Sequence, residues 1–500
     1  MQLERLLRWV FASQEGASRT PREIRRIAFV DAAIILLGWI PVFLAFFPGI
    51  FAYDVQQQLV QQPDSYTTHH PLVHTLYLIF FYNLKLGKTH NGGIALSVIV
   101  QMVVLACSQG AVMGFLVMRR VRDAVRRVIV GFCALMPIFS VMAVSVTKDV
   151  PYTAAFVAVM LCACVIEERP ESLRSKRLIV AYVVVVVFTC LLRNNGVVAV
   201  ILMMIGGTVA MRMRSVAAPE RRRFVAVSVV ALCVAWAANM GLKMATHAES
   251  GSSNEIMSLP YQQLARVYAQ ASKDMDAKDA EDLNELFPYL VGYDQRRSDP
   301  IKDPARVFES DENLRRFVEL YVTYGLREPR LYLEGALYTS IGFWYLDDIS
   351  NATIYDTVGD PEDSGGYFLM DTKPDLGVER TSLIPWLEQL YLKLFHENAY
   401  QEIPVFGALF SMGLYLWLEI FAAVVAWRRG RRMVMPCVLL GGYVLTLLFG
   451  PCALIRYAFP YVASAPLMLS MAFGTYETND GVDIWLSHCC GAHDAGMAPS

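Results

Sequence analysis

Residues 51–86, FAYDVQQQLVQQPDSYTTHHPLVHTLYLIFFYNLKL, decide how the chain is threaded, because a polar stretch and a short apolar run follow the first long apolar segment here. The apolar run, residues 72–86, is shorter than the roughly 20 residues that a helix needs to cross a hydrocarbon core. His74, Asn83 and Lys85 also interrupt it. Whether this run crosses a membrane determines on which side every later loop lies.

The composition of the whole chain is that of a membrane protein. Of the 500 residues, 55% are hydrophobic and only 18% are charged, and the mean hydropathy is +0.38. This apolar content exceeds what a soluble core needs. The net charge of -2 conceals a segregation, because residues 243–400 hold 28 acidic and 15 basic side chains and none of the ten cysteines. Two different environments are therefore expected, and a disulfide-stapled external domain is excluded.

Ten apolar runs are candidates for membrane-spanning helices: residues 28–47, 94–118, 128–146, 151–166, 178–192, 196–211, 224–242, 404–427, 434–450 and 456–473. They predict an all-α polytopic membrane protein with about ten transmembrane helices. The first run ends in Phe46-Phe47-Pro48 without a small-residue cleavage site. We therefore expect an anchor rather than a removed signal peptide.

Charge decides the role of residues 72–86, because short loops rich in Lys and Arg stay on the cytoplasmic side of a membrane. If this run does not cross, the basic N-terminus and all basic loops lie in the cytoplasm: residues 119–127, 169–177, 212–223 and 428–432. If it crossed, these four loops would lie outside while the N-terminus stayed inside. We therefore predict that residues 72–86 form a re-entrant or interfacial helix, and that both chain termini lie in the cytoplasm.

This threading predicts five regions in the plasma membrane protein. They are a cytoplasmic N-terminus (1–27), an N-terminal transmembrane region with about seven crossings and a first outer loop at 48–93 (28–242), a mostly helical extracytoplasmic domain (243–403), a C-terminal transmembrane region with about three crossings (404–474) and a cytoplasmic tail (475–500).

The unusual polar clusters all fall on the predicted outer face. They are Asp54 with His69 and His70, then Lys148-Asp149, then Arg193-Asn194-Asn195, and finally Arg456-Tyr457. Acids, bases and amides that converge at one membrane surface are what a functional site requires, because charges at membrane depth are costly unless they are paired or functional.

Each cluster also has an ordinary structural interpretation, and these alternatives stay open. They are Asp54 as a helix N-cap, His69-His70-Pro71 as a turn that starts a helix, Lys148-Asp149 as a surface ion pair, and Arg193 and Arg456 as side chains that reach lipid headgroups. Adjacent histidines alone also lack the spacing of metal ligands.

Several motifs carry a resemblance that covers most of the chain: FPGIFAYD, HHPLVHTL, SVTKDVPYTAAF, LLRNNGVVAV, EIMSLPYQQLARV and IRYAFPYVASAPL. The series resembles an uncharacterised family of polytopic bacterial membrane proteins allied to the GT-C glycosyltransferases. The resemblance implies a GT-C-like fold and transfer of a sugar from a polyprenyl phosphate to an acceptor on the extracytoplasmic side. It also implies one catalytic acid in each of the first two outer loops, which are Asp54 and Asp149 here. Asp54 has no neighbouring Glu, which departs from the paired-acid form of protein mannosyltransferases.

The expected chemistry is an inverting displacement at the anomeric carbon. Asp54 would accept the proton of the acceptor hydroxyl, and fixed cations would stabilise the leaving phosphate, for which Lys148, Arg193 and Arg456 are the candidates. His69, His70, Asn194, Asn195 and Tyr457 are the expected substrate-binding residues. The five glutamines at 56, 57, 58, 61 and 62 suit a sugar-binding surface or a solvated helix face equally well.

The expected partners are a polyprenyl-phosphate-linked sugar, the lipid bilayer, and a glycan, lipid or protein acceptor, with no nucleic acid. The sequence leaves open whether Asp54 and Asp149 hold Mg²⁺ or Mn²⁺. The alternative function is a transporter or flippase of lipid-linked glycans, which is disfavoured because the apolar segments are nearly free of acids and show no repeat. A polymerase or ligase of lipid-linked polysaccharide would share the same outer site.

Overall fold

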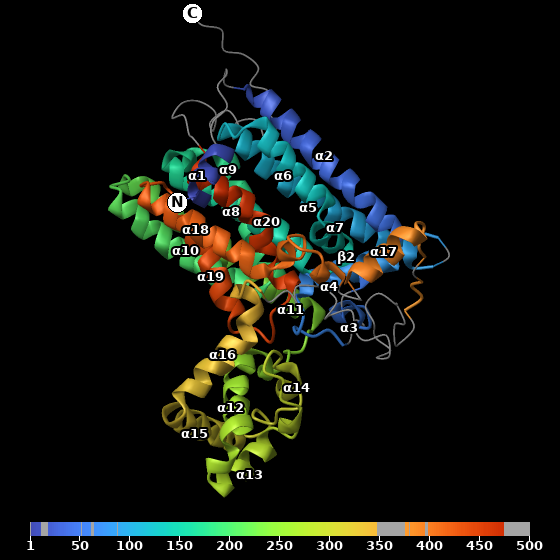
Figure 1. Cartoon of the computed structure of the whole chain (residues 1–500), viewed down its shortest axis with the longest axis vertical. Coiled ribbons are helices and arrows are strands. Elements are labelled where there is room, and N and C mark those ends of the chain that lie inside the picture. Colours follow the sequence, from blue (N-terminus) through green and yellow to red (C-terminus); the bar gives the residue numbers. More distant parts are fainter. Residues whose placement is uncertain are drawn as a thin grey trace, which may run out of the picture.

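The computed structural model describes residues 2–11, 19–51, 53–61, 65–87, 89–347, 376–379, 381–395 and 399–474 (Figure 1). These residues form helices and, within the described part of the chain, one sheet of two short strands. Each of the ten predicted apolar runs contains a helix, so the all-α class is confirmed. The predicted cytoplasmic tail, residues 475–500, lies outside the described residues.

The first half of the chain contains α1 (Gln2–Val10), α2 (Pro21–Ala45), β1 (Ile50–Phe51), α3 (Tyr53–Leu59), α4 (Leu72–Asn83), α5 (Asn91–Met118), α6 (Asp123–Leu135), α7 (Pro137–Val144), β2 (Ser145–Val146), α8 (Asp149–Glu168), η1 (Pro170–Arg174), α9 (Lys176–Leu192), α10 (Asn194–Met213) and α11 (Ala218–Thr246). The second half contains η2 (Ser253–Met257), α12 (Ser258–Ala271), α13 (Ala277–Leu286), α14 (Asp299–Lys302), α15 (Asp311–Arg327), α16 (Pro329–Trp344), α17 (Pro385–Phe395), α18 (Met412–Arg428), α19 (Val434–Leu447) and α20 (Ile455–Phe473).

Five helices, α2, α5, α8, α10 and α11, are long and apolar enough to cross a membrane by length and composition. The pair α6 and α7, bent by 51°, counts as a sixth if the two helices form one span. Large apolar side chains point outward, as lipid-facing residues do: Phe29 on α2 is 74% exposed and Trp236 on α11 is 70% exposed. The chain is therefore a membrane protein with several spanning helices. Helix α4 has only 12 residues, about 18 Å of helix, which is too short to cross.

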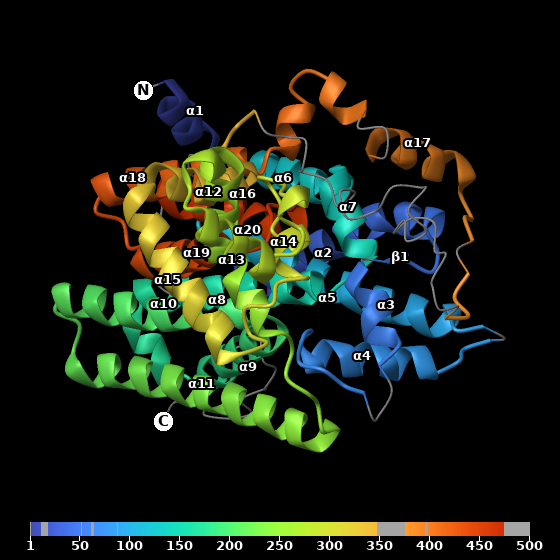
Figure 2. The same cartoon turned by 90° about the horizontal axis from the view of Figure 1, so that it is seen from below.

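The long helices form a bundle in which helices distant in sequence lie side by side. Helix α2 packs along α5, α10 along α19, and α18 along α20. Figure 2 shows α10 and α11 next to each other at one edge of the bundle, and α11 also packs on α9. Helix α8 lies inside the bundle, since 78% of its most apolar window is buried.

The strands β1 and β2 pair in parallel and join two distant parts of the chain. Ile50 pairs with Ser145 and Phe51 pairs with Val146. The β2 segment lies between α7 and α8, and Gln101 on α5 stabilises it. The buried Gln101 Nε2 donates to the carbonyl oxygens of Ala143 and Ser145 at 2.9 and 2.7 Å. Parallel strands leave the sheet in the same direction, so the segments that follow β1 and β2 emerge together.

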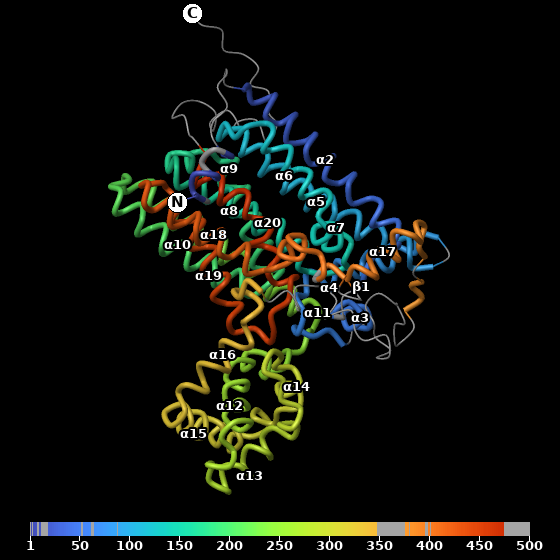
Figure 3. Tube along the Cα trace, viewed as in Figure 1, coloured from blue at the N-terminus to red at the C-terminus, as the bar shows by residue number. Residues whose placement is uncertain are grey.

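Helices α12 to α16 form a separate helical domain below the bundle, as Figure 3 shows. Its core centres on Tyr261, whose ring lies 5.0 Å from that of Phe287 and 5.3 Å from that of Phe317. The domain is attached through α16, which packs on α18, and through the Ser298 amide, which donates to the Pro451 carbonyl at 2.9 Å. Helix α17 falls within residues 243–403, the predicted extracytoplasmic domain. It packs on the main bundle instead, where Tyr391 is part of the large core.

Candidate functional site

The parallel strands bring the first predicted acid next to the predicted lysine. Asp54 lies three residues after β1, in the first turn of α3, and Lys148 lies two residues after β2, directly before α8. The Lys148 Nζ donates to Asp54 Oδ2 at 2.9 Å. The short strands therefore explain why two residues from separate loops meet.

Arginine and histidine side chains complete a group that we call the Asp54 cluster: Asp54, His70, Lys148 and Arg456. The Arg456 guanidinium, from the first turn of α20, lies 3.2 Å from the same Asp54 Oδ2. The Nδ1 atom of His70 lies 3.9 Å from Asp54 Oδ2 and 3.3 Å from Lys148 Nζ. Asp54 is buried except for 16% of its side chain, so the carboxylate keeps some access to solvent.

The electrostatics of the cluster keep Asp54 ionised. Burial alone would raise the pKa of Asp54, but the positive charges of Arg456 and Lys148 outweigh burial and hold that pKa well below its ordinary value. A carboxylate under these conditions is present at any physiological pH.

His70 is neutral and its tautomer follows from its neighbours. Burial and the charge of Lys148 lower the pKa of His70 to about 3, although Asp54 opposes them. Because the Lys148 ammonium can only donate, Nδ1 of His70 is the acceptor, and its Nε2–H donates to Gln57 Oε1 at 3.1 Å. His70 thus completes the hydrogen bonding of Lys148 without adding a charge.

A second group, the Asp149 cluster, lies beside the first and consists of Thr147, Asp149, Arg193 and Tyr443. Asp149 is fully buried, and its Oδ1 lies 2.9 Å from the Arg193 guanidinium. Its Oδ2 accepts a hydrogen bond from Thr147 Oγ1 at 3.0 Å. The same guanidinium donates to the Tyr443 hydroxyl at 3.3 Å. Two predicted residues, Asp149 and Arg193, therefore form a buried ion pair, although Oδ1 accepts no hydrogen bond of good geometry among the described residues.

Tyr457 joins the two clusters. The guanidinium carbons of Arg193 and Arg456 lie 4.7 and 4.9 Å from the centre of its ring, at cation–π distance. Arg456 also donates to the Tyr457 hydroxyl at 3.0 Å. Across both clusters, two carboxylates, Asp54 and Asp149, contact three cations, Lys148, Arg193 and Arg456.

The other predicted residues lie at the margins. His69 packs edge-on against His70, with ring centres 4.5 Å apart, and lies 3.9 Å from Glu255 at the start of the separate helical domain. Asn194 is exposed and Asn195 half-buried in the first turn of α10. Within the described residues, neither amide forms a hydrogen bond to the two clusters.

Sequence reasoning missed the residues that support the histidines. Gln58 is 1% exposed, its Oε1 lies 3.1 Å from His74 Nδ1, and its Nε2 donates to Thr75 at 2.9 Å. Gln58 is therefore neither a sugar-binding surface nor part of a solvated face. His74 is also buried, and its Nε2 has no hydrogen-bond partner among the described residues. The four-residue spacing of His70 and His74 did not indicate a shared helix face, because His70 precedes α4 and only His74 lies in that helix.

The clusters do not fit a divalent cation. Asp54 is already neutralised by Lys148 and Arg456, and Asp149 by Arg193. In the part of the chain that the structure describes, no group of three or more His, Cys, Asp or Glu side chains could hold a metal ion. The reaction proposed below is therefore not routed through a metal.

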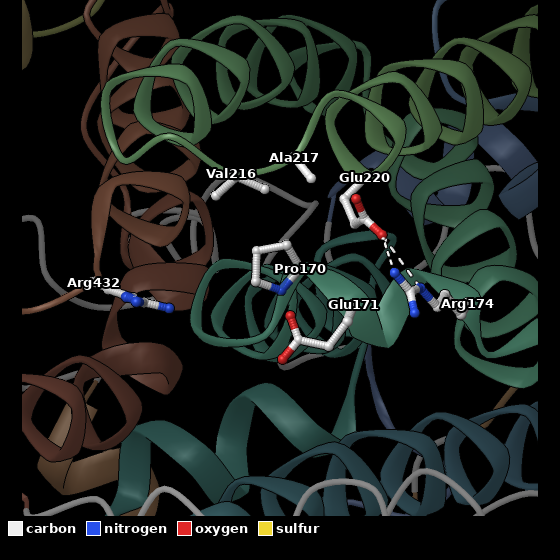
Figure 4. Close-up of a pocket in the computed structure, with 7 residues that line it drawn as sticks. All are labelled: Pro170, Glu171, Arg174, Val216, Ala217, Glu220 and Arg432. Carbon is white, nitrogen blue, oxygen red and sulfur yellow. Dashed lines mark hydrogen bonds and ion pairs between the residues drawn. The ribbon is translucent and has the colours of Figure 1, made fainter.

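A cavity of about 340 Å³ lies at the other end of α8, where Glu171, Arg174, Glu220 and Arg432 are among its lining residues (Figure 4). Arg174 and Glu220 neutralise each other there at 2.6 Å. The cavity contains no residue of the Asp54 or Asp149 cluster, and we place the candidate site at the two clusters, where buried acids and cations from separate loops meet.

No curated protein and no solved structure matches the chain. The model of a family of unknown function, DUF6020, matches residues 59–483, a range that begins just after Asp54. Since this range covers most of the sequence, the chain belongs to the DUF6020 family.

Proposed function

We propose that the protein is a membrane glycosyltransferase of the GT-C type, which moves a sugar from a polyprenyl-phosphate donor to an acceptor of the cell envelope. The observation that supports this proposal is a carboxylate held ionised between two cations, Lys148 and Arg456, at one end of a helical membrane bundle. This combination supplies a base and an anion-binding site within one hydrogen-bonded group.

In the proposed reaction, the acceptor oxygen forms a bond to the anomeric carbon while the bond from that carbon to the donor phosphate oxygen breaks. Asp54 takes the proton of the acceptor hydroxyl as general base. The phosphate leaves with its negative charge, and Lys148 and Arg456 stabilise that charge. Both cations contact Asp54 Oδ2, so a bound phosphate would share them and release the carboxylate for the acceptor.

We assign the Asp149 cluster to the support of this site. Asp149 orients Arg193, whose guanidinium lies against the Tyr457 ring, as does that of Arg456. Arg193 then provides the third positive charge for the donor phosphate. His69, His70, Asn194, Asn195 and Tyr457 are the proposed contacts of the sugar and the acceptor.

The proposed topology has about ten transmembrane helices, both termini in the cytoplasm and the two clusters on the extracytoplasmic side of the plasma membrane. It is supported by the position of the Arg-rich segments. Lys148 and Asp149 begin α8, whereas Arg169 and Arg174 follow its other end, about 30 Å away for a helix of 20 residues. A GT-C fold with α12 to α16 outside the membrane is part of the same proposal.

The test is sugar transfer by purified protein in lipid, supplied with radiolabelled monosaccharides on polyprenyl phosphate. We expect wild type to transfer the sugar and Asp54→Asn to lose transfer while it stays folded. The exposed pair Arg315 and Glu319 provides a control, because Glu319→Gln should keep full activity. Full activity of Asp54→Asn, or no donor use by wild type, would refute the proposal. Use of a preassembled glycan instead of a monosaccharide would indicate a polymerase or ligase.

A second candidate function, a transporter or flippase of lipid-linked glycans, is favoured by one observation. Glu419 lies near the middle of α18 and is 1% exposed. Transporters characteristically place ionisable residues at membrane depth. Translocation of a fluorescent lipid-linked glycan across proteoliposomes, without any sugar transfer, would support this function over the enzyme.

A further inference from the structure

Five acidic residues are buried among the described residues, and four of them have an arginine partner. The pairs are Asp31 with Arg126, Asp149 with Arg193, Glu167 with Arg214, and Glu220 with Arg174. The fifth acid, Glu419, has no Lys, Arg or His within ion-pair distance in the described part of the chain. Among the described residues, each buried carboxylate other than Glu419 is therefore paired with an arginine.

Glu419 is also almost fully buried within the bundle. Helix α18 has 17 residues and Glu419, the single acid of the apolar run 404–427, is near its middle. Ser464 on α20 donates to Glu419 Oε1 at 2.9 Å. Glu419 Oε2 and the nearby Tyr461 hydroxyl are both buried and lack a hydrogen-bond partner among the described residues. Two unsatisfied polar atoms therefore face the same interior region.

Among the described residues, the titratable groups near Glu419 are tyrosine and cysteine side chains, which cannot carry a positive charge. Tyr461 on α20 and Cys437 on α19 lie within electrostatic range of Glu419, and Tyr443 lies within range of Tyr461. A carboxylate with one hydroxyl donor and no cation is very unfavourable in a medium of low dielectric constant. A neutral carboxylic acid costs far less, and its hydroxyl group becomes a donor for an otherwise unsatisfied neighbour.

We propose that Glu419 is a proton-binding site inside the membrane and is occupied at neutral pH. The proton comes from solvent and is bound on Oε2, while Oε1 accepts the hydrogen bond from Ser464. The Glu419 hydroxyl then donates to the Tyr461 oxygen or to a water molecule between them. Tyr443, which lies within electrostatic range of Tyr461, accepts a hydrogen bond from Arg193. This inference does not depend on glycosyl transfer.

Infrared spectroscopy of the purified protein in lipid tests the proposal. We expect wild type to show the C=O stretching band of a protonated carboxylic acid, shifted in D₂O and absent from Glu419→Gln. The band should persist from about pH 5 to about pH 8, where an exposed glutamate is ionised. Glu220→Gln is the matched control, because Glu220 is also buried but is paired with Arg174, and that variant should keep the band.

A second variant keeps the test decisive if Glu419→Gln does not fold. Ser464→Ala removes the hydrogen bond to Oε1, so the carboxylic C=O band should move to higher frequency in a folded protein. A band that neither variant changes would overturn the proposal. So would a carboxylate band at Glu419 that appears with a thermal stabilisation by Na⁺, since a metal cation would then occupy the place of the proton.

Discussion

Lys148 Nζ lies 2.9 Å from Asp54 Oδ2, although 94 positions separate the two residues in the sequence. The contact depends on the pairing of β1 with β2, because Asp54 lies three residues after β1 and Lys148 two residues after β2. Arg456 reaches the same oxygen from the last described helix. The proposed base and the proposed phosphate-binding cations are therefore one electrostatic unit, and a change in one should alter the others.

Lys148→Met should shift the pH dependence of activity. This change removes one of the cations that hold the pKa of Asp54 well below its ordinary value, so burial then raises that pKa. Asp54 accepts a proton only when it is ionised, so the acid limb of kcat/KM should move to higher pH than in wild type. Transfer at neutral pH should fall by about 10- to 100-fold, as for a lost charge-assisted hydrogen bond. The pH–rate profile measures both effects. Lys278→Met, a change at an exposed site, should leave the profile unchanged, and an unshifted limb in Lys148→Met would contradict the assignment.

Asp149 and Arg193 should be strongly coupled in stability. Either Asp149→Asn or Arg193→Met leaves a buried charge without its partner, which costs about 3–5 kcal/mol. The double variant removes both charges, so its loss in the free energy of unfolding should be smaller than the sum of the two single losses. Denaturant titration of the four proteins in lipid gives the coupling energy. Additive losses would show that the 2.9 Å ion pair does not stabilise the bundle.

His70 should make the protein less stable in mild acid. Its folded pKa is lowered to about 3, whereas an unfolded histidine has a pKa of about 6.5. Between these values the unfolded state binds the additional proton, so stability falls as the pH falls, by up to about 1.4 kcal/mol per pH unit. The free energy of unfolding from pH 6 to pH 4 should therefore decline less steeply in His70→Gln. His247→Gln, at the end of α11 and outside both clusters, is the control. Equal slopes in wild type and His70→Gln would rule out a neutral His70.

Gly49→Ala should disturb the pairing of the strands. Gly49 has a φ of +149°, and an added Cβ would lie 2.8 Å from Val98 Cγ2 and 3.2 Å from the Val144 carbonyl oxygen. We expect a loss of about 1–3 kcal/mol in the free energy of unfolding and a parallel loss of sugar transfer, because β1 positions Asp54. Gly87→Ala is the control for backbone strain alone. Gly87 also has a positive φ, +104°, but an added Cβ there would have no neighbour within 4 Å among the described residues and would cause no crowding. A loss equal to that of Gly87→Ala would mean that crowding against Val98 and Val144 is not important.

The sequence alone predicted the helical membrane class and most elements of the bundle. Each apolar run contains a helix, and the short run at residues 72–86 contains only the 12 residues of α4. These features are local, because the length of an apolar run and the charge of its flanks act within one segment. The sequence also identified Asp54, Lys148 and Arg456, since a charged residue beside a long apolar run is unusual wherever it folds.

The tertiary structure alone decided which of these residues meet. In the structure, Asp54 forms ion pairs with Lys148 and Arg456, and Asp149 forms an ion pair with Arg193. Glu419 has no cation nearby among the described residues. The structure also showed that Gln57 and Gln58 hold histidines. No local pattern contains this information, because ion pairing depends on distances between atoms that are far apart in the chain. Those distances are set by the packing of the helices and by the parallel pairing of β1 with β2, which have two residues each.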